Sequence, residues 1–278
     1  MIQTVVSLRP WPILLALLLA AALTGCGDDE VGAGTVSVRL EHRVDADELS
    51  FDQVLYTNAA GNRYSVSKLE YILTGITLES ADGGLFELAG QHHCNAAAKG
   101  TRRVVNRSVP AATYSALRFT FGVEGNTPGT LPNQAHFDNM AWPAAMGGGG
   151  YHYMKLEGMY EDGGDEGGFA VHTGPAGGAD FTFDVSLPLV LTVAQDAWEI
   201  QVVMNLGEWF ANPNLYNFVG LGGIMGNADL QGQLQANGAT VFALGSVGHL
   251  DLDELDHDDH GEGDHEEEGD DHSEHAEG

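Results

Sequence analysis

Apolar and polar residues alternate with a period of two through most of residues 35–248, which predicts β-strands with one buried face. The first strand is expected at residues 35–44. Its apolar face carries Val36, Val38, Leu40, His42 and Val44. His42 is therefore expected to point toward the core, where a lone histidine is more often a hydrogen-bonded core residue than a metal ligand.

The same pattern continues in runs separated by turn residues. Gly61-Asn62 and Asp82-Gly83-Gly84 stand between β-rich runs at hairpin spacing, so these strands are predicted to be antiparallel. Tyr71, Leu73 and Ile76 are expected in the core. Further strands are predicted at residues 114–123, 151–158, 169–174, 180–193 and 198–205, and a helix at 225–237. The predicted fold is all-β, an antiparallel β-sandwich with short helical insertions.

The N-terminal residues have the features of a secretory signal. A basic Arg9 precedes an apolar run that is shorter than the roughly 20 residues of a membrane-spanning helix. The run ends in Leu23-Thr24-Gly25-Cys26, which resembles a bacterial lipobox. Residues 1–25 are therefore predicted to be a lipoprotein signal peptide, Cys26 the lipidated residue, and 26–34 a tether. The alternative is a plain secretory signal with an incidental cysteine.

Composition narrows the class of partner. The chain has 40 Asp and Glu against 11 Lys and Arg, a formal net charge of −29. Nucleic acid is excluded as a partner, because little positive charge is present to neutralise phosphates, whereas cations suit such a surface. With Cys26 lipidated, Cys94 is the one remaining cysteine, so no intrachain disulfide is expected.

The last residues, 249–278, are rich in Asp, Glu and His and contain no aromatic residue except histidine. Such a segment cannot bury enough surface to fold, so a disordered tail is predicted. Its interleaved imidazoles and carboxylates predict weak sites for copper or zinc, while a purely solvating acidic tail is the alternative. The tail histidines in question are His257, His260, His265, His272 and His275.

The segment from His136 to Gly174 concentrates the candidate chemistry. His152 and His172 lie in two predicted strands joined by an acidic hairpin, and sheets commonly build metal sites from such neighbouring strands. We expect His42, His152 and His172 to form a metal site. Neutral imidazole suits several transition metals, of which copper has the highest affinity among the divalent ions. Three methionines near the site carry soft thioethers that would favour Cu(I). They are Met140, Met146 and Met154, and each is also explained as a residue that fills the core.

Two further groups of histidines are weaker candidates. His136 opens the segment and is the least secure of its histidines. His92, His93 and Cys94 fall in residues 91–101, whose composition predicts a loop. Imidazole and thiolate are good copper or zinc ligands, but such a triplet on a loop is more often simply exposed.

Several motifs resemble the MbnP family of copper-binding proteins across roughly residues 35–247. The most specific are Met140-Ala141-Trp142-Pro143, Gly149-Gly150-Tyr151-His152-Tyr153-Met154 and His172-Thr173-Gly174. The resemblance also includes His42-Arg43-Val44-Asp45, Tyr56-Thr57-Asn58, Leu69-Glu70-Tyr71, Arg118-Phe119-Thr120-Phe121-Gly122, Glu157-Gly158, Trp209-Phe210 and Ile224-Met225. It implies a β-sandwich, export across the inner membrane, and copper, as Cu(I) or Cu(II), bound mainly by histidines.

The resemblance has one further implication. In some relatives a tryptophan is oxidised to kynurenine by a dihaem partner of the MauG type and joins the copper site. Trp142 is the residue that matches this role, with Trp198 and Trp209 as alternatives. The His-rich tail is not part of the shared pattern.

Two functional hypotheses follow. The first is a non-catalytic lipoprotein of the cell envelope, in the outer membrane facing the periplasm or the cell surface, that captures, buffers or transfers copper. The alternative is a structural or interaction β-sandwich lipoprotein whose metal binding is confined to the tail. An enzyme is not expected, because no Gly-x-Ser-x-Gly or His-Glu-x-x-His motif is present.

Overall fold

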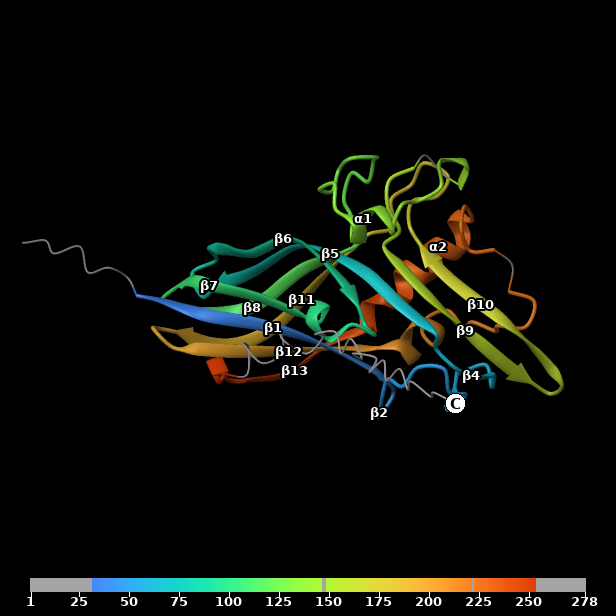
Figure 1. The fold of residues 1–278 in the computed structure, drawn as a ribbon, viewed down its shortest axis with the longest axis horizontal. Helices are drawn as coiled ribbons and strands as arrows, with labels where there is room; N and C mark the ends of the chain where they lie inside the picture. The colour runs from blue at the N-terminus through green and yellow to red at the C-terminus, as the bar shows by residue number, and fades with distance from the viewer. Residues whose placement is uncertain (1–31, 147–148, 222, 254–278) are drawn as a thin grey trace, which may run out of the picture. The chain divides into compact units, whose positions relative to one another are not determined.

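Two β-sheets enclose one hydrophobic core. The computed structural model describes residues 32–146, 149–221 and 223–253. The smaller sheet, called the β1 sheet, has the order β13-β12-β1-β2, with β7 also paired to β1 (Figure 1). Its strands are β1 (Ala33–Val44), β2 (Asp47–Glu48), β7 (Arg103–Pro110), β12 (Ala197–Asn205) and β13 (Phe242–His249).

The larger sheet, called the β5 sheet, has the order β11-β8-β5-β9-β4-β3, with β10 paired to β9 and β6 to β5. Its strands are β3 (Tyr56–Thr57), β4 (Arg63–Tyr64), β5 (Lys68–Ser80), β6 (Leu85–Asn95), β8 (Ala112–Phe121), β9 (Met154–Asp162), β10 (Asp165–Thr173) and β11 (Phe183–Val193). The predicted all-β sandwich is confirmed.

Helical segments are short, as predicted. Two α-helices lie wholly within the described residues, α1 (Ala135–Asp138) and α2 (Ala228–Asn237), the latter within the predicted helix. Asn227 caps α2, because its side chain accepts a hydrogen bond from the Leu230 N–H. The 3₁₀ segments are η1 (Lys99–Thr101), η2 (Ala144–Met146), η3 (Leu206–Phe210) and η4 (Gly238–Thr240). None of the helices in these residues is long and apolar enough to cross a membrane.

Strand β1 has the alternation that the sequence predicts. Its inward face is buried throughout, His42 included, which is 5 % exposed. Where strands that follow one another in the chain are paired, they pair antiparallel, as predicted. β1 and β12 instead run parallel, with Thr35 opposite Ala197 and His42 opposite Met204. The chain returns to β1 from a distant segment, so no hairpin constrains the direction of this pair.

Register defines the two faces of the β5 sheet around β9. Tyr71, Met154 and Thr173 are cross-strand partners and share the buried face toward the β1 sheet. Glu70, Lys155 and His172, each one residue away along its strand, are partners on the opposite face. We call these the inner and the outer face. Strand alternation therefore separates His172 from the core side of the molecule.

Several boundaries differ from the sequence predictions, and two of them involve histidines. Residues 91–95 belong to β6 rather than to a loop, because they pair with residues 70–74 of β5 despite their weak β-composition. At the C-terminal end, β13 includes His249, the first residue of the predicted tail, whose ring stacks on Trp198 with centroids 4.0 Å apart. Residues 254–278, with all five tail histidines, and residues 1–31, with Cys26, lie outside the described residues.

Candidate metal centre

His152 and His172 come together as the sequence predicts. Their ring centroids are 5.1 Å apart and the rings are nearly perpendicular, at 89°. His172 is the penultimate residue of β10, on the outer face. His152 precedes β9, where its backbone N–H donates to the Met140 carbonyl. The pair is therefore formed by one strand end and the segment that leads into the neighbouring strand.

Each imidazole has one ring nitrogen held by an acceptor. Nδ1 of His152 lies 3.0 Å from the Met140 carbonyl oxygen, and Nε2 of His172 lies 2.9 Å from Oε1 of Glu157. A ring nitrogen that donates its proton leaves the other nitrogen with a free lone pair. For His152 that atom is Nε2, which is buried and has no hydrogen-bond partner. For His172 it is Nδ1.

Burial keeps the His152 ring neutral. Desolvation, with smaller contributions from the Lys155 and His172 charges, lowers the pKa of His152 to about 4. A neutral imidazole is the form that binds a metal. At neutral pH, no proton has to be removed from His152 before a metal can bind.

Trp142 packs against the histidine pair. Its indole is 3 % exposed, and its ring centroid lies 4.7 Å from that of His152. The indole N–H is buried without a hydrogen-bond partner. The other predicted candidates lie elsewhere: Trp198 stacks on His249, and Trp209 is buried against Phe121. Of these three tryptophans, Trp142 is therefore the one beside the histidine pair.

The end of β10 is fixed from α2. The Gln231 side chain donates to the His172 carbonyl at 2.9 Å and accepts from the Gly174 N–H at 3.1 Å. Gln231 is 1 % exposed. Its amide thus holds the backbone on both sides of Thr173, and with it the position of the His172 ring. The sequence does not predict Gln231 or Glu157 as site residues. Glu157 lies diagonally across from His172 on the neighbouring strand, a relationship that only the strand register shows.

His42 does not join this pair, contrary to the sequence prediction. Nε2 of His42 lies 2.9 Å from the Tyr71 hydroxyl and 3.9 Å from Sγ of Cys94, both on the inner face of the β5 sheet. His172 lies on the outer face of that sheet. Burial, followed by the Arg102 charge, lowers the pKa of His42 to about 3. His42 is thus a hydrogen-bonded core histidine, which is the alternative that its position on β1 allowed.

The other candidates also fall outside the pair. Met154 packs in the core on the inner face. Met140 is fully buried, and its carbonyl oxygen, not its thioether, contacts His152. His136, on α1, stacks on His93 with centroids 5.3 Å apart. Within residues 32–146, 149–221 and 223–253, no group of three or more His, Cys, Asp or Glu side chains is arranged to hold a metal ion. The candidate centre is therefore a two-histidine site beside a tryptophan.

Comparison with known families identifies the family of this chain. The MbnP family model matches residues 33–225, which include Trp142, His152 and His172. The chain belongs to the MbnP family. The structure is also similar to that of MbnP from Methylosinus trichosporium, with a TM-score of 0.53 and 16 % sequence identity, over 80 % of this chain and 100 % of the other. At this identity the structural match supports the shared fold alone. A search of curated proteins finds no match.

The MbnP match ends before α2. Gln231, which holds the end of β10, therefore lies outside the matched residues, as does β13. The family assignment covers both histidines and the tryptophan, whereas the support from α2 is established by this structure.

Proposed function

We propose that this MbnP-family protein is an exported, lipid-anchored, non-catalytic copper-binding protein in which His152 and His172 hold the metal. The observation that supports the proposal best is the buried Nε2 of His152, which has no hydrogen-bond partner and belongs to a ring packed against His172. A buried polar atom without a partner is costly unless a ligand engages it. A metal ion between the two imidazoles would satisfy it.

The residues suit copper better than zinc. Structural zinc sites take four protein ligands and catalytic ones three, whereas two histidines are the nitrogen donors brought together here. Cu(I) is stable with two or three ligands, and imidazole is among its ligands. Glu157 and the Met140 carbonyl hydrogen-bond to the two rings and orient them, as such partners do for metal-binding histidines. Copper capture, buffering or transfer is the role that this set supports.

Trp142 completes the proposal. Its indole lies against His152, so oxidation to kynurenine by a dihaem partner of the MauG type would place a new amine and carbonyl beside the metal. Trp142 is the proposed site of any such modification. Intact-mass analysis of protein from its native envelope would report this oxidation, lipidation of Cys26 and bound copper together.

The test is a competitive Cu(I) titration without oxygen, using the full chain with its five tail histidines changed to Asn. We expect one tightly bound copper, lost in His152→Ala and in the less buried His172→Ala. His136→Ala is the matched control and should retain it. If both site variants bind copper stoichiometrically, the assignment is wrong. If changing the tail histidines alone abolishes binding, the alternative of a structural lipoprotein with a metal-binding tail is favoured.

A further inference from the structure

A cavity that does not include the histidine pair opens beside the end of β1. It has a volume of about 440 Å³ and lies among β1, β2 and the segment from β6 through η1 to β7. Small-molecule sites typically measure roughly 300–1,000 Å³. The cavity is therefore large enough for a small organic molecule.

The cavity collects positive charge in a strongly acidic protein. Of the chain's 11 Lys and Arg residues, five line it, together with two carboxylates, Glu41 and Glu48. The five are Arg39, Arg43, Lys99, Arg102 and Arg103. The lining cations therefore outnumber the lining carboxylates, in a chain that has 40 acidic residues.

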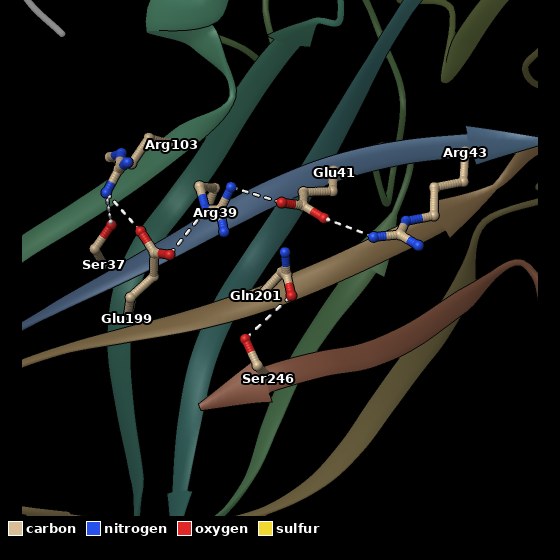
Figure 2. A network of polar contacts seen from close by, with 8 residues as sticks. All are labelled: Ser37, Arg39, Glu41, Arg43, Arg103, Glu199, Gln201 and Ser246. Atoms are coloured by element: carbon tan, nitrogen blue, oxygen red, sulfur yellow. Dashed lines mark hydrogen bonds and ion pairs between the residues drawn. The ribbon is translucent and has the colours of Figure 1, made fainter. Parts of the chain in front are cut away.

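Three of these arginines share two carboxylates. Glu199 accepts from Arg39 Nε at 2.8 Å and from Arg103 Nη1 at 2.7 Å. Glu41 lies 2.6 Å from Arg39 and 3.6 Å from Arg43 (Figure 2). This network holds the guanidinium groups of Arg39 and Arg43 on β1 and of Arg103 on β7 in place.

Arg102 and Lys99 add charge that no described carboxylate pairs with. Arg102 is half-buried, and its Nε is buried without a hydrogen-bond partner. Lys99, on η1, is exposed at the cavity edge. His42 also lines the cavity and is neutral at physiological pH, because burial and the Arg102 charge lower its pKa to about 3. The Nε–H of Arg102 is thus a buried donor that lacks an acceptor.

We infer that this cavity binds a small organic anion through carboxylate or phosphate groups, with Arg102 and Lys99 as its main contacts. A planar guanidinium matches either oxyanion, and the buried Nε of Arg102 would gain the acceptor it lacks. Arg102 and Lys99, which no described carboxylate pairs with, favour an anion with more than one charged group. The five cations exclude this cavity as a second metal site.

Isothermal titration of the full chain with citrate and, separately, with inorganic pyrophosphate tests the inference. We expect at least one probe to bind with one-to-one stoichiometry, and the tighter probe distinguishes a carboxylate from a phosphate ligand. Arg102→Gln should weaken binding at least tenfold and Lys99→Gln several-fold. Arg118→Gln is the matched control: it removes an equal charge from an exposed pair with Glu79 outside the cavity and should leave binding unchanged.

The exposed Lys99 variant keeps the test valid if Arg102→Gln fails to fold. Absence of binding by either probe to the unaltered chain would overturn the inference. So would equal weakening by Arg118→Gln and Lys99→Gln, which would show a general charge effect rather than a site.

Discussion

Gly174 lies so close to the indole of Trp142 that a Cβ on residue 174 would stand 2.6 Å from Cε3 and Cζ3 of the ring. Real Cβ atoms essentially never come this near another heavy atom, and the Trp142 ring also packs against His152. Close packing therefore requires glycine at residue 174. Through this contact the end of β10 packs against Trp142 of the candidate metal centre.

Gly174→Ala should displace Trp142 and destabilise the protein by about 1–3 kcal/mol, the usual range for overpacking a filled core. Copper affinity should fall with it, since the His152 ring rests on the displaced indole. Urea unfolding and Cu(I) competition measure the two effects. Gly168→Ala is the control on the same strand, where the nearest atoms to a new Cβ are 3.8 Å away. Equal stability of both variants would contradict the packing argument.

Glu157→Gln should weaken Cu(I) binding about 10–100-fold, the typical effect of removing a carboxylate that orients a metal-binding histidine. The neutral amide retains the shape of the side chain but no longer stabilises the His172 N–H to the same extent. Competitive titration with a chromophoric chelator gives the affinity.

Glu161→Gln on the same strand is the control for the loss of one charge. Its exposed pair with Arg63 contributes little, so copper affinity should not change. A similar loss in both variants would show that general charge, not the contact with His172, sets the affinity.

The protein should lose stability in acid partly through His42. Because its folded pKa is about 3, below the ordinary value of 6.5, the unfolded chain binds the proton more readily. The resulting stabilisation is complete above pH 6.5 and is lost as the pH falls from about 6.5 toward 3. In His42→Gln, which keeps a partner for Tyr71, the decline should be shallower by up to about 1.4 kcal/mol per pH unit. His152, with a pKa of about 4, contributes in the same direction in both proteins.

Urea unfolding between pH 7 and pH 4.5 measures this difference. Parallel pH profiles for the unaltered chain and His42→Gln would show that His42 is not held neutral by burial.

Cys94 should resist thiol reagents until the protein unfolds. It is fully buried, and burial raises the pKa of its thiol to about 12, so the reactive thiolate is almost absent at neutral pH. Labelling followed by peptide mass spectrometry should find Cys94 unmodified in the native protein and fully modified in denaturant. Rapid labelling of the folded protein would contradict the buried position beside His42 and Tyr71.

Strand periodicity predicted the fold and the proximity of His152 and His172. It identified the inward face of β1 and placed His152 and His172 on neighbouring chain segments, although His152 lies just before β9 rather than within it, and the MbnP motifs identified Trp142. It failed for His42 because alternation shows which side of its own strand a residue occupies, not which face of the opposing sheet it meets. His42 meets the inner face, at Tyr71, whereas His172 is on the outer face.

Two other features were beyond the sequence pattern. Gln231 acts through a contact between α2 and the end of β10, 59 positions apart in the chain, and nothing in a short polar helix indicates it. The cation-lined cavity combines residues of β1 with residues of η1 and β7, none of which forms a local motif. Both depend on tertiary packing between segments that local periodicity treats separately.

The parallel pairing of β1 with β12 also affects how the chain can fold. β1 is the first described strand, yet its partner begins at residue 197, and this pairing cannot form until the chain has emerged that far. Contacts between such distant segments form late because a long loop must close first. During synthesis β1 therefore remains without this partner until β12 has been made, although its antiparallel partners β2 and β7 come earlier in the chain.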